Sequence, residues 1–135
     1  MTRRSGRIHR GDGPRAVTAS ALLTVTVTRA TCVRMIVVGE IDHSTIPVLD
    51  RALDGQPIGT WKTLVVDLSR VSFCSIGGAQ WLADLIQRAG GLGVPASMVV
   101  TRPVSRVLSF LPQADLIATH TDLASALHAV GHWRY

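Results

Sequence analysis

The chain has 135 residues, of which 47% are hydrophobic and 17% charged, which suffices for one domain with a substantial core but not for two. Only 4% of the residues are aromatic, so the core must be mainly aliphatic. The formal net charge of +5 is uneven, because residues 1–16 hold five arginines and one aspartate and the rest of the chain carries only +1. The excess charge therefore belongs to a tail, which argues against a basic face that binds nucleic acid specifically.

Residues 1–19 are predicted to form a disordered basic N-terminal tail, followed by a single domain over residues 20–135. Residues 1–16 combine arginines with glycines and a proline and hold almost no apolar residue, so they have no core to bury. Such a tail could bind nucleic acid or another acidic surface, because arginine neutralises phosphate. A flexible leader is the favoured interpretation, since no aromatic residue is interleaved with the arginines.

Neither an export signal nor a membrane span is expected. The apolar run over residues 16–27 follows basic residues, but threonine and serine interrupt it and residues 24–29 alternate like a strand. No apolar run approaches the ~18 residues that a membrane span needs. Cys32 and Cys74 have neither metal-site spacing nor the context of a small secreted protein, which predicts free thiols in a cytoplasmic protein.

Two strands joined by a turn are predicted first. Apolar residues alternate with threonine over residues 23–28, which is typical of a half-buried strand. A second strand is predicted over residues 32–39, and the turn at residues 29–31 would pair it with the first. The two strands are therefore expected to form a hairpin.

A short helix is predicted after this hairpin. Asp42 or Ser44 can cap it, and Pro47 is tolerated only in its first turn. A loop that contains glycine and proline follows over residues 55–60. The apolar residues that share one face of the helix are Ile46, Leu49 and Leu53.

The central strand is predicted over residues 64–68, a short apolar run without helical spacing. Ser69 and Arg70 interrupt this run. A helix is then expected to start near Ala79 and to end at the glycine pair of residues 90–91.

The remaining elements alternate strand and helix. A buried strand is predicted over residues 96–100, and a short helix follows between two prolines. A short strand over residues 116–119 and a last helix, capped by Thr121 or Asp122, come next. This order predicts an α/β fold: a single domain with a mixed β-sheet and helices chiefly on one face.

A turn of small residues, Ser75 to Gly78, separates the central strand from its helix. Backbone N–H groups and the positive end of the helix dipole would make it suitable for an anion or an acidic side chain of a partner. Asp42 follows the end of another strand, so Asp42 and Ser75 should border one surface patch. An exposed Ile76 beside Gly77 would be an apolar contact for a partner protein, whereas an Ile76 turned inward would only pack in the core of this chain.

This pattern resembles the signature of STAS domains, in particular the bacterial anti-sigma factor antagonists. The resemblance covers roughly residues 20–132, depends on two segments in the family's order and spacing, and implies the α/β fold of that family. The residues that carry it are Asp67-Leu68, Val71-Ser72-Phe73 and Gly78, and, upstream, Val38-Gly39-Glu40-Ile41-Asp42-His43-Ser44.

The chain departs from the family where the partner kinase acts. Members carry Asp-Ser-Ser/Thr-Gly at the helix start, and the kinase phosphorylates the first serine. Here Ser75 replaces the acidic residue, Ile76 the phosphorylated serine and Gly77 the following Ser/Thr. Isoleucine has no hydroxyl group, so phosphorylation at position 76 is chemically impossible. Ser75 could be a displaced phosphoacceptor, but a helix cap is the favoured interpretation.

No arrangement typical of a catalytic or metal site is found. Cys74 and Ser75 could be nucleophiles, but no histidine stands in a recognisable relation to them and the GxSxG register is absent. His128 and His132 have the spacing of two metal ligands on a helix, but no third ligand is placed nearby, so we interpret them as surface residues. The sequence thus predicts a protein that is not an enzyme and has no cofactor, and a Cys74 that is a buried small residue rather than a redox site.

The resemblance implies a regulator that binds a kinase-type anti-sigma factor and so releases a sigma factor to RNA polymerase. Asp42, Ser44 and the turn of Ser75, Ile76, Gly77 and Gly78 would contact that partner, without the usual phosphorylation switch. One alternative is a soluble STAS subunit that binds the ATPase of an ABC-type transport complex. Another is a small-molecule or nucleotide-sensing module, although the turn offers no lysine or arginine to a phosphate.

Overall fold

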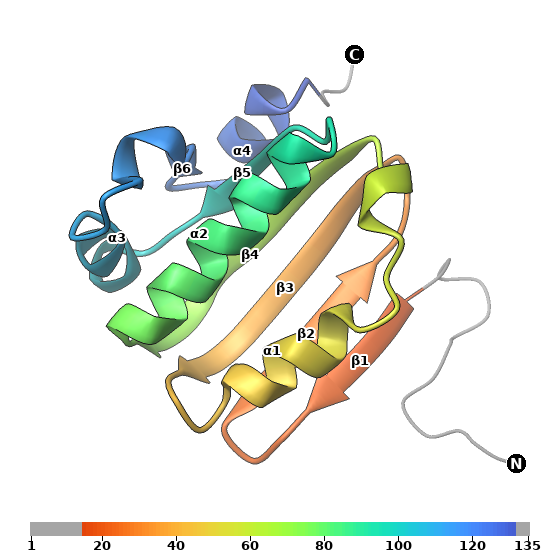
Figure 1. The fold of residues 1–135 in the computed structure, drawn as a ribbon. Helices are drawn as coiled ribbons and strands as arrows, with labels where there is room; N and C mark the ends of the chain where they lie inside the picture. The colour runs from red at the N-terminus through yellow and green to blue at the C-terminus, as the bar shows by residue number, and fades with distance from the viewer. Residues whose placement is uncertain (1–14, 132–135) are drawn as a thin grey trace, which may run out of the picture.

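A six-stranded sheet forms the centre of the computed structural model, which describes residues 15–131 (Figure 1). The strands are β1 (Arg15–Ala19), β2 (Leu23–Thr28), β3 (Cys32–Ile41), β4 (Thr63–Cys74), β5 (Ala96–Val99) and β6 (Thr119–His120). The helices are α1 (Ile46–Leu53), α2 (Ile76–Gly91), α3 (Arg102–Leu108) and α4 (Leu123–Ala129), with short 3-10 turns at Ile58–Thr60 and Ala114–Leu116.

The sheet is mixed, and its strands follow one another in chain order from β1 to β6. The pairs β1–β2 and β2–β3 are antiparallel, whereas β3–β4, β4–β5 and β5–β6 are parallel. Parallel neighbours need a crossover, and α1, α2 and α3 supply these connections. The predicted hairpin of the β2 and β3 strands and the predicted α/β sheet are confirmed.

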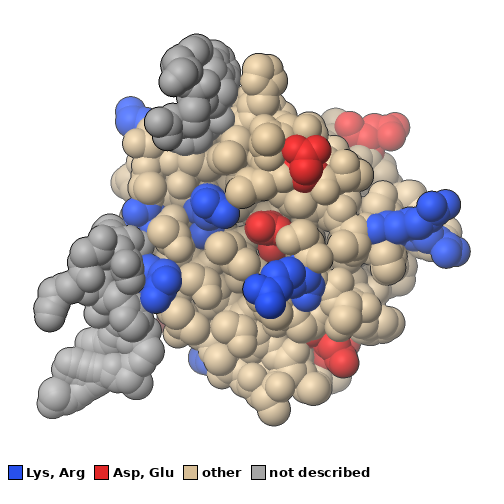
Figure 2. Space-filling view, turned by 180° about the vertical axis from the view of Figure 1, so that it is seen from behind, with Lys and Arg blue, Asp and Glu red and all other residues tan. Residues whose placement is uncertain are grey.

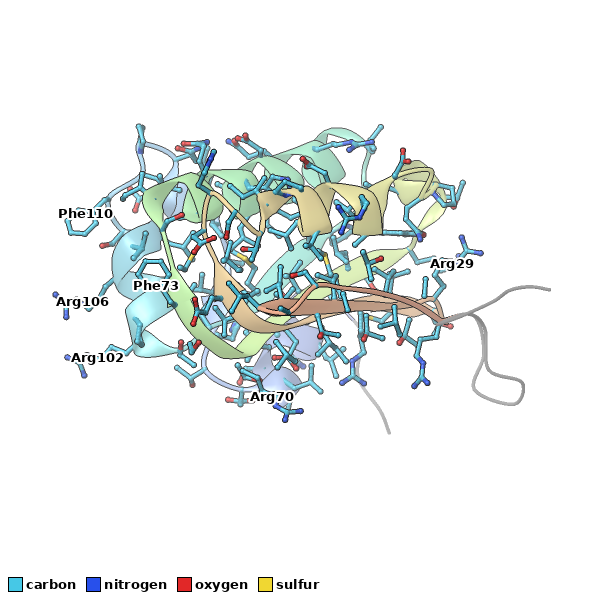
Figure 3. The ribbon with its side chains drawn as sticks, turned by 90° about the horizontal axis from the view of Figure 1, so that it is seen from below. Arg29, Arg70, Phe73, Arg102, Arg106 and Phe110 are labelled. Carbon is cyan, nitrogen blue, oxygen red and sulfur yellow. The ribbon has the colours of Figure 1, made fainter. Side chains whose placement is uncertain are left out.

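Two layers of helix cover the sheet unequally (Figures 1 and 3). Helices α1, α2 and α3 share the larger core with one face of the sheet, which is mainly aliphatic as the composition predicts. Helix α4 packs on the opposite face over a smaller cluster that includes Val65, Val99 and Ala126. Seen from that side, lysine and arginine side chains are dispersed and interspersed with acidic ones (Figure 2).

The first described residues correct the predicted domain boundary. Residues 15–19, which we assigned to a disordered tail, form the edge strand β1, in which Val17 is opposite Thr26 of β2. The composition of residues 1–16 predicted disorder, but the order of residues 15–19 comes from backbone pairing with β2, which composition does not record. The rest of the predicted tail and His132 lie outside the described residues.

The elements around the small-residue turn also differ from prediction. Strand β4 continues through Ser69 and Arg70, which are exposed, and ends only at Cys74. Helix α2 then begins at Ile76, three residues before the predicted start. Two shifts of register in the β3–β4 pairing, near Val38 and Glu40, accompany this long strand. The turn between strand and helix is therefore a single residue, Ser75.

The C-terminal third has the predicted order with shorter elements. Helix α3 ends at Leu108, before the proline that was expected to stop it. The strand predicted over residues 116–119 is wrong: residues 114–116 form a 3-10 turn, and β6 has only two residues. The last helix begins as predicted, with the Asp122 carboxylate accepting a hydrogen bond from the Ser125 N–H at 2.8 Å.

Candidate functional site

The ends of β3 and β4 bring two predicted site segments together. Ile41 is paired with Cys74 at the last position of the parallel ladder. Directly beyond it, the Ser75 N–H donates to the Ile41 carbonyl at 2.9 Å. Because Asp42 follows Ile41 and Ile76 follows Ser75, both turns leave the same edge of the sheet. The two segments therefore border one surface, which we call the switch-position surface (Asp42, Ser44 and Ser75 to Gly78).

The Asp42 carboxylate orders the turn before α1 rather than capping the helix. Its Oδ1 accepts hydrogen bonds from the Ser44 N–H at 2.9 Å and the Ser44 hydroxyl at 2.7 Å. The Thr45 N–H is a third donor, at 3.2 Å. These bonds, the Ser44 hydroxyl first among them, lower the pKa of Asp42, so the group is ionised near neutral pH.

The prediction that Asp42 or Ser44 is the N-cap of this helix is wrong. The N-cap residue is Thr45, whose side chain makes no capping hydrogen bond. Its buried hydroxyl donates to the Glu40 carbonyl at 2.7 Å and accepts from the Asp42 N–H at 2.9 Å. The threonine is therefore occupied in closing the turn onto the end of β3, which leaves the carboxylate of Asp42 near the surface.

Ser75 is the N-cap of α2. Its Oγ accepts a hydrogen bond from the Gly78 N–H at 3.0 Å, which satisfies one of the backbone donors that a helix start leaves free. The prediction that Ser75 is a helix cap is thus confirmed. A hydroxyl in this role is engaged and only partly exposed.

Ile76 points outward and does not join the core. Its side chain is 55% exposed, although isoleucine is among the residues most often buried. Gly77 beside it is also exposed, and a Cβ there would be 3.9 Å from the Ile46 Cδ1 at the start of α1. An aliphatic side chain thus projects from the surface at position 76.

Gly78 is required by a close approach to the sheet. A Cβ at this position would lie 2.5 Å from the Ile41 Cγ2 and 3.3 Å from the Cys74 Sγ. Both neighbours are buried, so they have little room to move. The glycine therefore sets how near the first turn of α2 lies to the end of β3.

Cys74 does not have the properties of a reactive thiol. It is buried, and burial raises its pKa to about 11. Its thiol donates to the Ser75 carbonyl at 3.5 Å. The thiolate is the nucleophilic form, so at neutral pH this side chain is almost wholly in its unreactive state. Cys32, the other cysteine, is also buried, and burial raises its pKa as well.

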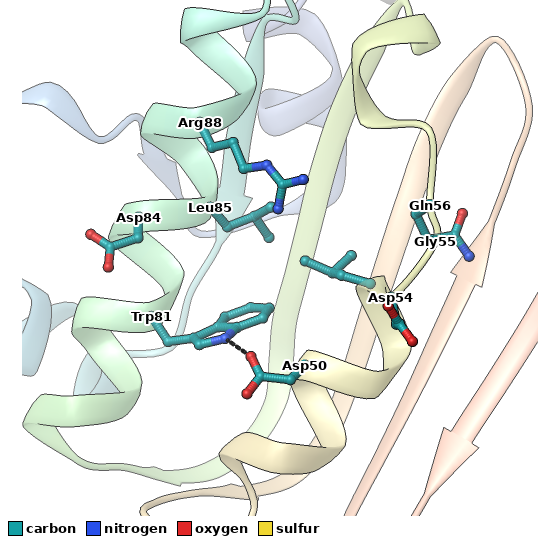
Figure 4. Close-up of a pocket in the computed structure, with 9 residues that line it drawn as sticks. Asp50, Asp54, Gly55, Gln56, Trp81, Asp84, Leu85 and Arg88 are labelled. Atoms are coloured by element: carbon teal, nitrogen blue, oxygen red, sulfur yellow. Dashed lines mark hydrogen bonds between the residues drawn. The ribbon is translucent and has the colours of Figure 1, made fainter.

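A hollow between α1 and α2 is a feature that the sequence analysis missed (Figure 4). It has a volume of about 640 Å³ and is lined by Asp50, Asp54, Asp84 and other residues. The Trp81 Nε1–H donates to the Asp50 Oδ1 at 2.8 Å across it. The signal was present in the residue type, since a tryptophan near a core needs a partner for its N–H.

Metal and membrane features are limited to what the described residues contain. Among residues 15–131, no three histidine, cysteine, aspartate or glutamate side chains gather as a metal site would require. Over the same residues, no helix combines the length and the apolar character needed to cross a membrane.

The family model described as "Mlab, STAS domain" matches residues 25–118. The fold is similar to that of an anti-sigma factor antagonist from Mycobacterium paratuberculosis, with 26% sequence identity, a TM-score of 0.70, and coverage of 84% of this chain and 98% of that chain. It is also similar to unphosphorylated SpoIIAA, an anti-sigma factor antagonist, with 16% identity, a TM-score of 0.63, and coverage of 82% and 99%. A variant of RsbS from Moorella thermoacetica has 18% identity, a TM-score of 0.61, and coverage of 79% and 94%. No curated protein matches the chain at a significant level.

Proposed function

Because the chain belongs to the STAS domain family, we propose that it is a non-catalytic regulator that binds an anti-sigma factor and so releases a sigma factor. The likeness to the mycobacterial antagonist, which spans nearly all of that protein, supports this role. A protein that acts on a sigma factor works in the cytoplasm, so the proposal includes that location.

The single observation that carries the proposal is that the Ile76 side chain is exposed at the edge of the sheet where β3 and β4 end, and that hydrogen bonds hold the backbone there. Hydrogen bonds from Ser44 fix the Asp42 turn, and the Ser75 cap fixes the start of α2. The apolar side chain therefore projects from a rigid base, which lowers the entropy lost when a partner covers it. Full burial of an isoleucine is worth roughly 1.5–3 kcal/mol, so covering its exposed half would contribute about 1 kcal/mol.

We propose further that this binding lacks the phosphorylation switch. Isoleucine at position 76 offers no hydroxyl to a kinase, and the Ser75 hydroxyl is engaged with the Gly78 N–H. Phosphorylation of a docking surface acts by adding about two negative charges, which repel or must be desolvated. Without it, the anti-sigma factor stays bound whether or not ATP is present.

The test is capture of a kinase-type anti-sigma factor from the same genome on the immobilised full chain, with and without ATP. Retention in both conditions is expected. In the Ile76→Ser variant, which regains a hydroxyl, ATP should cause release together with a phosphate on residue 76. ATP-dependent release of the wild-type chain with a phosphate on Ser75 would overturn the unswitched binding.

Two further variants separate the docking contact from general damage. Ile76→Glu should abolish capture, because it places a charge in the contact. Leu92→Ala is the matched control, since Leu92 is also half exposed but follows the opposite end of α2, about 24 Å away along the helix. Equal capture by wild type and Ile76→Glu, or co-purification of a transport ATPase with no anti-sigma factor, would contradict the proposed function.

A further inference from the structure

A second hollow lies beside the switch-position surface, between the end of β4 and α3. We name it the Phe–Arg groove, after Phe73, Arg102, Arg106 and Phe110, which line it together with smaller residues. Figure 3 shows these four side chains at one end of the molecule, whereas Arg29 and Arg70 lie elsewhere. We propose that this groove binds an acidic segment of a partner protein that also carries apolar side chains.

The apolar part of the groove is not explained by packing within the chain. Phe73 is 50% exposed and Phe110 is 73% exposed, although both rings border the groove. The Phe110 N–H donates to the Val107 carbonyl at 3.1 Å, so the backbone is held in a turn while the ring stays in solvent. Two phenylalanines from distant segments, exposed side by side in a chain with few aromatic residues, indicate a contact surface.

The charged part of the groove is also unexplained by folding. Arg102 and Arg106 lie four residues apart on α3, so their like charges repel each other. Arg102 also stands at the start of the helix, where the dipole disfavours a positive charge. Both side chains are exposed, and within residues 15–131 neither guanidinium forms an ion pair or hydrogen bond.

Charge complementarity selects the occupant. The groove is lined by two arginines and by no acidic residue. A guanidinium binds a carboxylate through two parallel hydrogen bonds, and such pairs are about twice as strong as neutral ones. Aspartate or glutamate on a partner would relieve the repulsion between Arg102 and Arg106, and an aliphatic or aromatic neighbour would cover the phenylalanine rings.

The shape of the groove favours a peptide segment over a small molecule. Its volume of about 340 Å³ is at the lower end of the range of small-molecule sites, roughly 300–1,000 Å³. Such sites bury most of their ligand, whereas the rings that flank this groove are themselves largely exposed. A polypeptide can lie along an open groove and extend beyond it.

The groove adjoins the surface proposed above but does not depend on it. Cys74 lines the groove, and Ser75 and Ile76 follow it directly in the chain. One partner could therefore contact both surfaces. The inference goes beyond the proposed function, because the groove's chemistry requires an acidic, apolar segment whether or not the partner is an anti-sigma factor.

The test uses the full chain and a phage-displayed library of random peptides. Peptides enriched on the wild-type chain should combine aspartate or glutamate with aliphatic or aromatic residues. One enriched peptide is then synthesised with a fluorescent label, and its affinity is measured by anisotropy. Affinity should fall as salt is raised, because salt screens exposed charge pairs.

Matched variants locate the binding. Phe110→Ala and Arg106→Glu should each weaken the labelled peptide by about tenfold or more, since aromatic and arginine side chains carry most of the energy at protein interfaces. Leu92→Ala is the apolar control and Arg51→Glu the charge control. Arg51 is exposed in the last turn of α1, as Arg106 is in the last turn of α3. Both controls should bind as the wild type does.

Several outcomes would overturn the inference. They are the absence of any enriched peptide, enrichment of peptides without acidic residues, and binding that Phe110→Ala and Arg106→Glu leave unchanged. A short oligothymidylate that binds more tightly than the acidic peptide, and loses affinity in the same variants, would identify the groove as a nucleic-acid contact instead. Ile76→Glu should leave peptide binding intact, so a failure of the proposed function remains distinguishable from a failure here.

Discussion

Gly78→Ala is the substitution for which the structure makes the most decisive prediction. The new Cβ would lie 2.5 Å from the Ile41 Cγ2, a distance that unstrained carbon atoms do not adopt. Ile41 is fully buried, and its carbonyl accepts the hydrogen bond from the Ser75 N–H that joins β3 to the start of α2. Either the helix must move away from the sheet or this bond must be distorted.

Two opposing effects decide the magnitude. Replacing glycine by alanine inside a helix normally stabilises a protein by up to about 1 kcal/mol, because alanine loses less backbone entropy. Overpacking a core by one methyl group costs about 1–3 kcal/mol. Gly90, also in α2, is the reference position, because a Cβ there would meet nothing within 4 Å. Gly78→Ala should therefore be about 1–3 kcal/mol less stable than Gly90→Ala.

Urea denaturation followed by circular dichroism measures this difference directly. Ile41→Leu removes the Cγ2 branch while keeping the side-chain volume, so it should relieve the clash. The double variant Gly78→Ala, Ile41→Leu should then be more stable than the sum of the single effects predicts. Gly78→Ala as stable as Gly90→Ala, with additive effects in the double variant, would refute the steric argument.

The other two predictions concern the titratable groups near the same edge. In a Cys32→Ala background at pH 8, Cys74 should react with a thiol reagent about a hundredfold more slowly in the native protein than in urea. The reason is that a pKa of about 11 leaves about a hundredth of the thiolate that the ordinary pKa of 9.0 would give. Fast labelling of the native protein would contradict the buried, protonated thiol. The lowered pKa of Asp42 makes a stabilising contribution that is complete above the ordinary value of 3.8 and is lost as the pH falls through the folded value. Asp42→Asn should therefore be less stable than the wild type at neutral pH, and urea titrations should show this difference in stability disappearing below about pH 4. A difference in stability that stays constant down to pH 2 would argue against the lowered pKa of Asp42.

Sequence periodicity predicted the elements that local patterns determine. The alternation of valine and threonine fixed the β2 strand at its observed bounds, and glycine ended α2 where predicted. Boundaries were wrong where long-range pairing outweighed local signals. Strand β4 runs through Ser69 and Arg70 because β3 pairs with it beyond the apolar run, and β1 is ordered because β2 offers it a partner.

The sequence by itself determined that the chain is an α/β protein of the STAS family and that position 76 cannot accept a phosphate, since both follow from the identity and order of residues. Only the tertiary structure decided that Ile76 faces solvent, that Gly78 lies against Ile41, and that Phe73 and Phe110 line one groove with the arginines of α3. The physical reason is that these relations join segments far apart in the chain, and their geometry is set by how the sheet and helices pack rather than by any local pattern.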